Sequence, residues 1–90
     1  MIRWSATSVA DLESIRDYIS NDSEAEAIRF LKEIKVKVME IPDFPFLGRV
    51  VPEMNDENIR EIIFGNYRII YGIQDDLIKV HTIFHHKRKF

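Results

Sequence analysis

The chain has 90 residues, of which 46% are hydrophobic and 31% charged, and its formal net charge is −2. This balance is typical of one small globular domain spanning residues 1–90, and it excludes a disordered chain. Cysteine is absent, which excludes disulfides and zinc–thiolate sites, and neither a signal peptide nor an apolar run of roughly 18 residues is present, so we expect a cytoplasmic protein.

The first half predicts a short strand followed by two helices. Residues 1–4 are apolar and compatible with a strand. Apolar residues then recur at helical spacing in two stretches separated by the segment SNDSEAE. Ser23 and Glu26 form a capping-box pattern that begins the second helix near residue 24, and Pro42 ends it near residue 41. The short link between the stretches predicts an antiparallel helical hairpin.

The second half changes to the period of strands. After a loop-like segment with all three prolines, residues 42–58, strands are predicted over 60–64, 67–73 and 77–85. Gly65-Asn66 and Asp75-Asp76 suit two-residue turns between them. The order β-α-α-β-β-β indicates an α+β domain, with the helical hairpin packed on one face of an antiparallel sheet.

Two-residue turns assign each side chain of these strands to one sheet face. Phe64 then lies opposite Tyr67, and Ile73 opposite Ile78. The nearly apolar face, which we expect the helices to cover, comprises Ile62, Phe64, Tyr67, Ile69, Tyr71, Ile73, Ile78, Val80, Thr82 and Phe84. The open face comprises Glu61, Ile63, Arg68, Ile70, Lys79, His81, Ile83 and His85.

Three isoleucines on the open face, Ile63, Ile70 and Ile83, have no element of this chain left to cover them. An exposed apolar stripe on a small domain usually marks a partner site. Because Arg68 and Lys79 flank the stripe, it predicts docking of an acidic amphipathic segment that folds on contact.

The chain resembles the RelE/ParE superfamily of toxins from type II toxin–antitoxin pairs. The resemblance spans nearly the whole chain and rests, in order, on WSATSVADLESIRDYI, GRVVPE, IREI, NYRIIY and FHHKR. It implies the same α+β element order. It also implies a cognate antitoxin that wraps the toxin with a partly disordered segment, giving a toxin–antitoxin hetero-oligomer. Two targets are implied: DNA gyrase for ParE-type members, and the ribosome with its mRNA for RelE-type nucleases.

For a nuclease, the resemblance implies catalytic roles for three residues. Arg68 matches an arginine that stabilises the phosphate in the transition state, Glu53 matches a general base, and His85 matches a general acid. Attack by a 2′-hydroxyl on a phosphodiester needs such a base, cation and acid, and no metal. Glu61 is an alternative base. The structural alternative is that Glu61 only pairs with Arg68 and that His85 is a solvated strand end.

Other residues are predicted to bind the target or the antitoxin: Arg49, Glu61, Ile63, Ile70, Lys79, His81, Ile83, Lys87 and Arg88. For Arg49 the alternative is a structural pair with a nearby acid, and for the basic C-terminus it is a solubilising tail. No metal site is expected, because His81 and His85 would lie roughly 13 Å apart along a strand. No cofactor or membrane contact is expected either.

The charge distribution decides which of the two targets the sequence favours. The segment 42–58 offers Arg49 alone among Glu53, Asp56 and Glu57, and the whole chain is acidic. Chemistry on a dense phosphate surface favours a basic protein. The sequence therefore favours ParE-like inhibition of DNA gyrase, with ribosome-dependent mRNA cleavage as the alternative and an inactive module held by an antitoxin as the second alternative.

Overall fold

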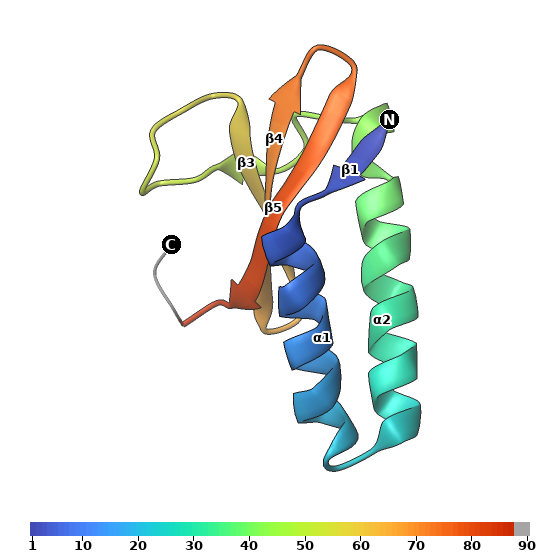
Figure 1. The fold of residues 1–90 in the computed structure, drawn as a ribbon. Coiled ribbons are helices and arrows are strands. Elements are labelled where there is room, and N and C mark those ends of the chain that lie inside the picture. Colours follow the sequence, from blue (N-terminus) through green and yellow to red (C-terminus); the bar gives the residue numbers. More distant parts are fainter. Residues whose placement is uncertain (88–90) are drawn as a thin grey trace.

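A helical hairpin packs against one face of a five-stranded sheet in the computed structural model, which describes residues 1–87 (Figure 1). The α+β class and the element order are confirmed, with one added strand inside the predicted loop. The elements are β1 (Ile2–Trp4), α1 (Ala6–Ser20), α2 (Glu24–Met39), a 3₁₀ turn η1 (Ile41–Asp43), β2 (Arg49–Val50), β3 (Ile59–Phe64), β4 (Tyr67–Gln74) and β5 (Leu77–His85).

Serine caps begin both helices. Ser5 accepts a hydrogen bond from the Ser8 amide at 3.0 Å and donates its own hydroxyl to the His81 carbonyl at 2.7 Å, which ties α1 to β5. Ser23 accepts from the Glu26 amide at 3.2 Å. Only this half of the predicted capping box forms, because the Ser23 amide donates to the Ile19 carbonyl and the Glu26 carboxylate binds Arg29.

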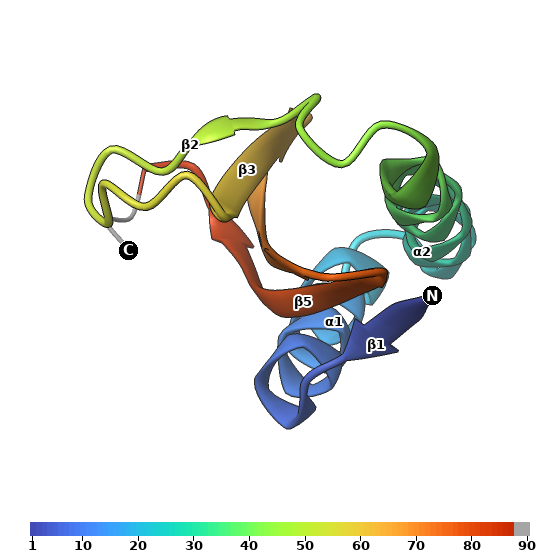
Figure 2. The same ribbon diagram turned by 90° about the horizontal axis from the view of Figure 1, so that it is seen from above.

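The strands are ordered β1-β5-β4-β3-β2. The sheet is mixed rather than wholly antiparallel, since β1 runs parallel to β5. Figure 2 shows both helices on one side of the sheet and the segment between β2 and β3 on the other side. The core between helices and sheet contains Leu12, Ile15, Ile34, Val38, Ile41, Ile62, Ile69, Tyr71, Ile78, Val80 and Ile83. Neither helix of the described residues is long and apolar enough to cross a membrane.

Both predicted two-residue turns are confirmed by the register. Phe64 pairs with Tyr67, and Ile73 pairs with Ile78. Gly65, first in its turn, has φ +58°, a conformation that glycine adopts at little cost.

A β-bulge, which the sequence did not reveal, interrupts the β4–β5 ladder. Ile70 pairs with Thr82, but Tyr71 pairs with Val80, so His81 is the extra residue. Its ring lies over Gly72, where an added Cβ would come within 2.6 Å of the His81 Nε2. The glycine therefore provides the space that the bulged side chain occupies.

The bulge reverses the predicted faces in the last part of β5. Ile83 and His85 were expected on the open face, but they pair with Ile69 and Tyr67 and lie on the helix-covered face. Phe84 was expected under the helices, but its ring lies against the Arg68 guanidinium on the open face. Thr82 pairs with Ile70, while its hydroxyl still donates to Asp11 of α1. The prediction was wrong because one unpaired residue shifts alternation by one position.

The predicted exposed stripe of isoleucines is also wrong. Ile63 is 51% exposed, but Ile70 is 0% and Ile83 1% exposed. Ile83 is in the core, for the reason just given. Ile70 keeps its place on the open face, but the segment that follows β2 reaches over that face: Glu53 binds Arg68 there, and Val51 is itself buried.

Candidate functional site

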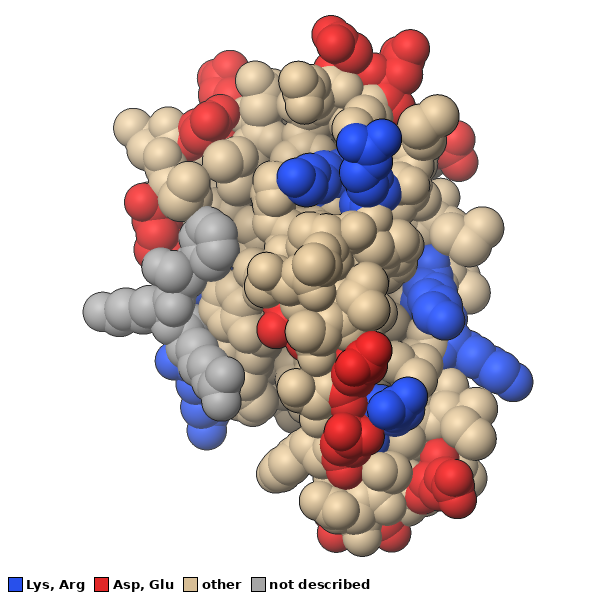
Figure 3. Space-filling view, viewed as in Figure 1, with Lys and Arg blue, Asp and Glu red and all other residues tan. Residues whose placement is uncertain are grey.

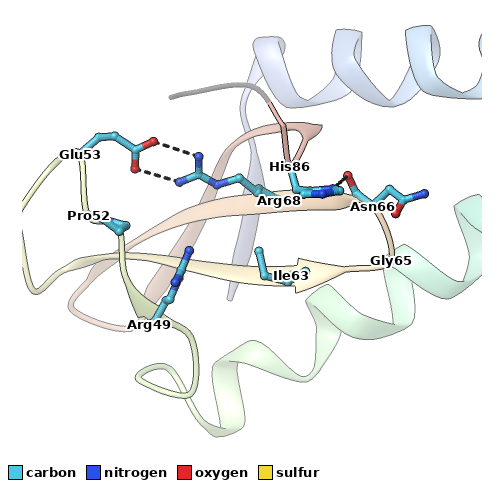
Figure 4. Close-up of a pocket in the computed structure, with 8 residues that line it drawn as sticks. All are labelled: Arg49, Pro52, Glu53, Ile63, Gly65, Asn66, Arg68 and His86. Carbon is cyan, nitrogen blue, oxygen red and sulfur yellow. Dashed lines mark hydrogen bonds and ion pairs between the residues drawn. The ribbon is translucent and has the colours of Figure 1, made fainter.

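The open face carries a hollow, called the Arg68 hollow below, to which several segments contribute (Figure 4). β3 and β4 form its floor, the segment after β2 forms one wall, and the β3–β4 turn with the end of β5 forms the other. It is lined by Arg49, Pro52, Glu53, Ile63, Gly65, Asn66, Arg68 and His86.

Arg68 is the centre of this hollow and is only 6% exposed. Its Nη1 and Nη2 donate to the two carboxylate oxygens of Glu53, each at 3.0 Å, and its Nε donates to Glu61 Oε1 at 2.6 Å. The Phe84 ring lies 5.1 Å from the guanidinium carbon. The hydrogen bonds that Arg68 donates to Glu53 raise the Arg68 pKa above its usual value against the opposing effect of burial, and Glu61 adds to the increase.

Glu61 connects two arginines. It is 2% exposed, and its second oxygen binds the Arg49 Nε. A buried carboxylate is tolerated only where cations and hydrogen bonds replace its lost hydration. The predicted structural pairs of Glu61 with Arg68 and of Arg49 with a nearby acid are therefore both present. The charges of the two guanidinium groups and the two carboxylates cancel in this network.

The Glu53 carboxylate reaches Arg68 from a tightly turned segment. The Val51 carbonyl accepts from the amides of Met54 and Asn55 at 3.0 and 3.1 Å, and Asn55 has φ +48°. These turns aim the Glu53 side chain back over the sheet, where it stays 29% exposed. The predicted proximity of Glu53 to Arg68 is thus correct.

The histidine in the Arg68 hollow is His86 and not the predicted His85. The His86 Nδ1 lies 2.9 Å from the Asn66 carbonyl oxygen, and its backbone amide donates to the same oxygen at 2.7 Å. Since a carbonyl only accepts, Nδ1 carries the proton and Nε2 is the unprotonated nitrogen of the neutral ring. The sequence correctly predicted a histidine in this hollow, but the bulge makes it His86 rather than His85.

His85 packs against the Tyr67 ring at a centroid distance of 5.7 Å, and its own ring stacks on that of His86 at 4.9 Å. Its Nδ1 accepts from the Lys87 amide at 3.2 Å. It lines a separate hollow beside α1, together with Asp11, Tyr18, Tyr67 and Lys87 among others. The predicted grouping of His85 with Arg68 and Glu53 is therefore wrong.

The remaining predicted site residues lie apart from the Arg68 hollow. Lys79 is exposed, and His81 packs over Gly72. Burial, and secondly the charge of Lys79, lowers the His81 pKa. Ile70 and Ile83 are buried, and Arg88 lies outside the described residues. No group of three His, Asp or Glu side chains within residues 1–87 is arranged to hold a metal ion.

Sequence reasoning missed Tyr71 as a positioning residue. The buried phenol donates to the Pro45 carbonyl at 2.7 Å and accepts from the Gly48 amide at 3.1 Å. An added Cβ on Gly48 would lie 2.7 Å from the Tyr71 oxygen and 2.6 Å from the Glu61 carbonyl oxygen. This contact fixes the chain immediately before Arg49. The glycine in GRVVPE was the available signal, since a close backbone approach often requires glycine.

Comparison with known proteins gives matches that cover nearly the whole chain. The family model described as the ParE toxin of the type II toxin–antitoxin system parDE matches residues 2–90. Toxin RelE2 of Caulobacter vibrioides is 30% identical over 86 residues, which is 94% of this chain and 93% of that protein.

Two solved toxin–antitoxin systems share the fold. The chromosomal ParDE system from P. aeruginosa matches with a TM-score of 0.77 at 17% identity, covering 93% of this chain and 92% of that chain. The YoeB–YefM complex from Staphylococcus aureus matches with a TM-score of 0.59 at 16% identity, covering 96% and 95%. At these identities the structural likeness shows the fold alone.

Proposed function

Because the chain belongs to the ParE toxin family of type II toxin–antitoxin systems, we propose that it inhibits DNA gyrase and that a cognate antitoxin neutralises it. A toxin that inhibits gyrase by binding to it needs no catalytic residue. Two toxin–antitoxin systems among the structural matches support an antitoxin partner. The proposal places the protein in the cytoplasm, where gyrase acts.

One observation carries the choice of target: the cations of the Arg68 hollow are already engaged by carboxylates. Arg68 is held by Glu53 and Glu61 and is nearly buried, and Arg49 is bound to Glu61. Catalysis of phosphoryl transfer requires cationic donors aimed at the charge that develops on the phosphate. A neutral network in a chain of net charge −2 supports a protein target over ribosome-bound RNA.

A second candidate function has its own observation. Glu53, Arg68 and His86 share one hollow, and these residue types are the base, cation and acid of metal-independent RNA cleavage. In this candidate the acid is His86 after its Nε2 has gained a proton, and Glu53 must release Arg68 before a phosphate binds. The relative named Toxin RelE2 is compatible with this alternative.

The deciding experiment induces the toxin alone in a bacterial host and adds the purified toxin to gyrase in a plasmid supercoiling assay. We expect loss of supercoiling in vitro, and double-strand DNA breaks with intact transcripts in cells. His86→Ala should keep both effects, and His85→Ala, which removes the ring stacked on His86 but not the one that lines the Arg68 hollow, is the comparison variant.

Two other outcomes have definite meanings. Codon-specific cuts in translated messages that disappear in His86→Ala, but persist in His85→Ala, would establish the nuclease and refute the gyrase proposal. A folded protein that binds its antitoxin but neither slows growth nor inhibits gyrase would be an inactive binding module.

A further inference from the structure

Helix α2 is apolar on two opposite sides. Its inner side buries Ala27, Ile34 and Val38. On its outer side Ile28, Val36 and Met39 are 50%, 62% and 68% exposed. Residues at these spacings share one face of a helix. We call Ile28, Lys32, Lys35, Val36 and Met39 the outer strip, which extends about 16 Å along the helix at 1.5 Å per residue.

The outer strip is basic although the first half of the chain is acidic. Two acids of the same helix, Glu26 and Glu33, are bound to Arg29. Within the described residues, neither Lys32 nor Lys35 forms an ion pair with an acid. Figure 3 shows basic side chains interspersed with uncharged ones along α2, on the right of the view. The strip therefore combines exposed apolar groups with two lysines that form no ion pair among the described residues.

A hollow borders the strip on one side. It is lined by Lys32, Glu33, Val36, Lys37, Glu40 and Phe64. Phe64 is half-buried, and it touches the Phe30 ring at a centroid distance of 5.8 Å. A hollow with an aromatic wall beside exposed aliphatic groups suits one anchoring apolar side chain of a partner.

We propose that the outer strip of α2 binds an acidic amphipathic helix of the cognate antitoxin. Exposed apolar residues at helical spacing fit the apolar face of a second helix, and Lys32 with Lys35 fits acids on its border. The sheet face loses this role, because only Ile63 of its predicted isoleucine stripe is exposed. The inference rests on the proposed function in taking an antitoxin as the partner.

The same charges disfavour two other occupants. A second copy of this chain would bring the lysines of one strip against those of the other, and like charges across an interface are unfavourable. Nucleic acid gains nothing from the three apolar side chains, and two lysines are few for binding a phosphate backbone.

The test measures the dissociation constant of the purified antitoxin, encoded beside this toxin, for toxin variants. We expect the double variant Lys32→Glu/Lys35→Glu to bind at least tenfold more weakly, and Val36→Ser/Met39→Ser about tenfold more weakly. All four side chains are on the surface, so thermal melts should match the wild type. The control is Arg3→Glu, which reverses an exposed cation on β1, away from the outer strip.

Charge exchange adds a positive result that a folding defect cannot give. An antitoxin with two acids of its docking helix changed to lysine should bind Lys32→Glu/Lys35→Glu more tightly than it binds the wild-type toxin.

Binding of both α2 variants within twofold of the wild type would overturn the proposal. So would a control that weakens binding as much as the α2 charge reversal, or loss of binding in Ile63→Ser while the α2 variants keep it. A dimer of the toxin alone that dissociates in Val36→Ser/Met39→Ser would instead assign the strip to self-association. Because binding is measured apart from gyrase inhibition, the proposed target can fail while this inference holds, and the reverse.

Discussion

The two hairpins of the sheet share β4 but differ in their regularity. β3 and β4 pair without interruption from Ile59 opposite Gly72 to Phe64 opposite Tyr67. β4 and β5 change register between Ile70 and Tyr71. Side-chain alternation therefore runs unbroken across the first hairpin and reverses within the second.

This difference determines what surrounds Arg68. From the regular hairpin, Glu61 reaches the arginine by simple alternation along β3. From the bulged hairpin, the reversal brings Phe84 onto the guanidinium and turns His85 toward the helices. One extra residue in β5 thus decides which aromatic group and which histidine lie near the buried cation.

The largest effect is expected from Arg68→Ala, because Arg68 belongs to both hairpins. Its removal leaves the buried Glu61 with Arg49 alone, and loss of one partner from a buried pair costs about 3–5 kcal/mol. Urea denaturation should show a decrease near the lower end of that range, because Arg49 remains. A decrease below about 1 kcal/mol would mean that the network contributes little, and Arg29→Ala on exposed α2 is the control with a small expected effect.

Gly72→Ala is expected to have the next largest effect on stability, and it acts at the bulge that distinguishes the two hairpins. The new Cβ would lie 2.6 Å from the His81 ring, so the bulge must rearrange, at a cost of about 1–3 kcal/mol for overpacking. In a His81→Ala background the same substitution should cost much less. Equal costs in both backgrounds would show that the ring over Gly72 does not hold the bulge.

Tyr71→Phe tests how β4 positions the segment that enters the regular hairpin. The phenol makes two hydrogen bonds, to the Pro45 carbonyl and from the Gly48 amide. Its loss leaves buried groups unpaired, and we expect about 1–2 kcal/mol of destabilisation in denaturant titrations. Tyr18→Phe, at an exposed phenol on α1, is the matched control, and a similar effect for both variants would contradict this role.

The sequence was sufficient for the regular parts of the molecule and insufficient where one residue breaks the pattern. Helical spacing and Ser23 predicted the hairpin, and Gly65-Asn66 predicted the first turn, because those signals are local. The bulge depends on His81 packing over Gly72 from another strand, which no local period reveals. The pair of Glu61 with Arg68 could be predicted from the first hairpin alone, whereas the identity of the nearby histidine could not.

The smallest expected effect is the pH dependence that His81 contributes to stability. Burial lowers its pKa in the folded protein, while the unfolded chain keeps a value near 6.5. Just below that value the unfolded state therefore binds more protons than the folded state. The contribution of neutral His81 to the free energy of unfolding is complete above about pH 6.5 and falls as the pH decreases toward the folded pKa. Thermal melts of the wild type between pH 7.5 and 5.5 should decline more steeply than those of His81→Gln. Parallel curves would mean that the bulged ring is as accessible to protons in the folded protein as in the unfolded chain, and that the second hairpin opens at the bulge. His85→Gln and His86→Gln, measured alongside, are the matched controls for this slope.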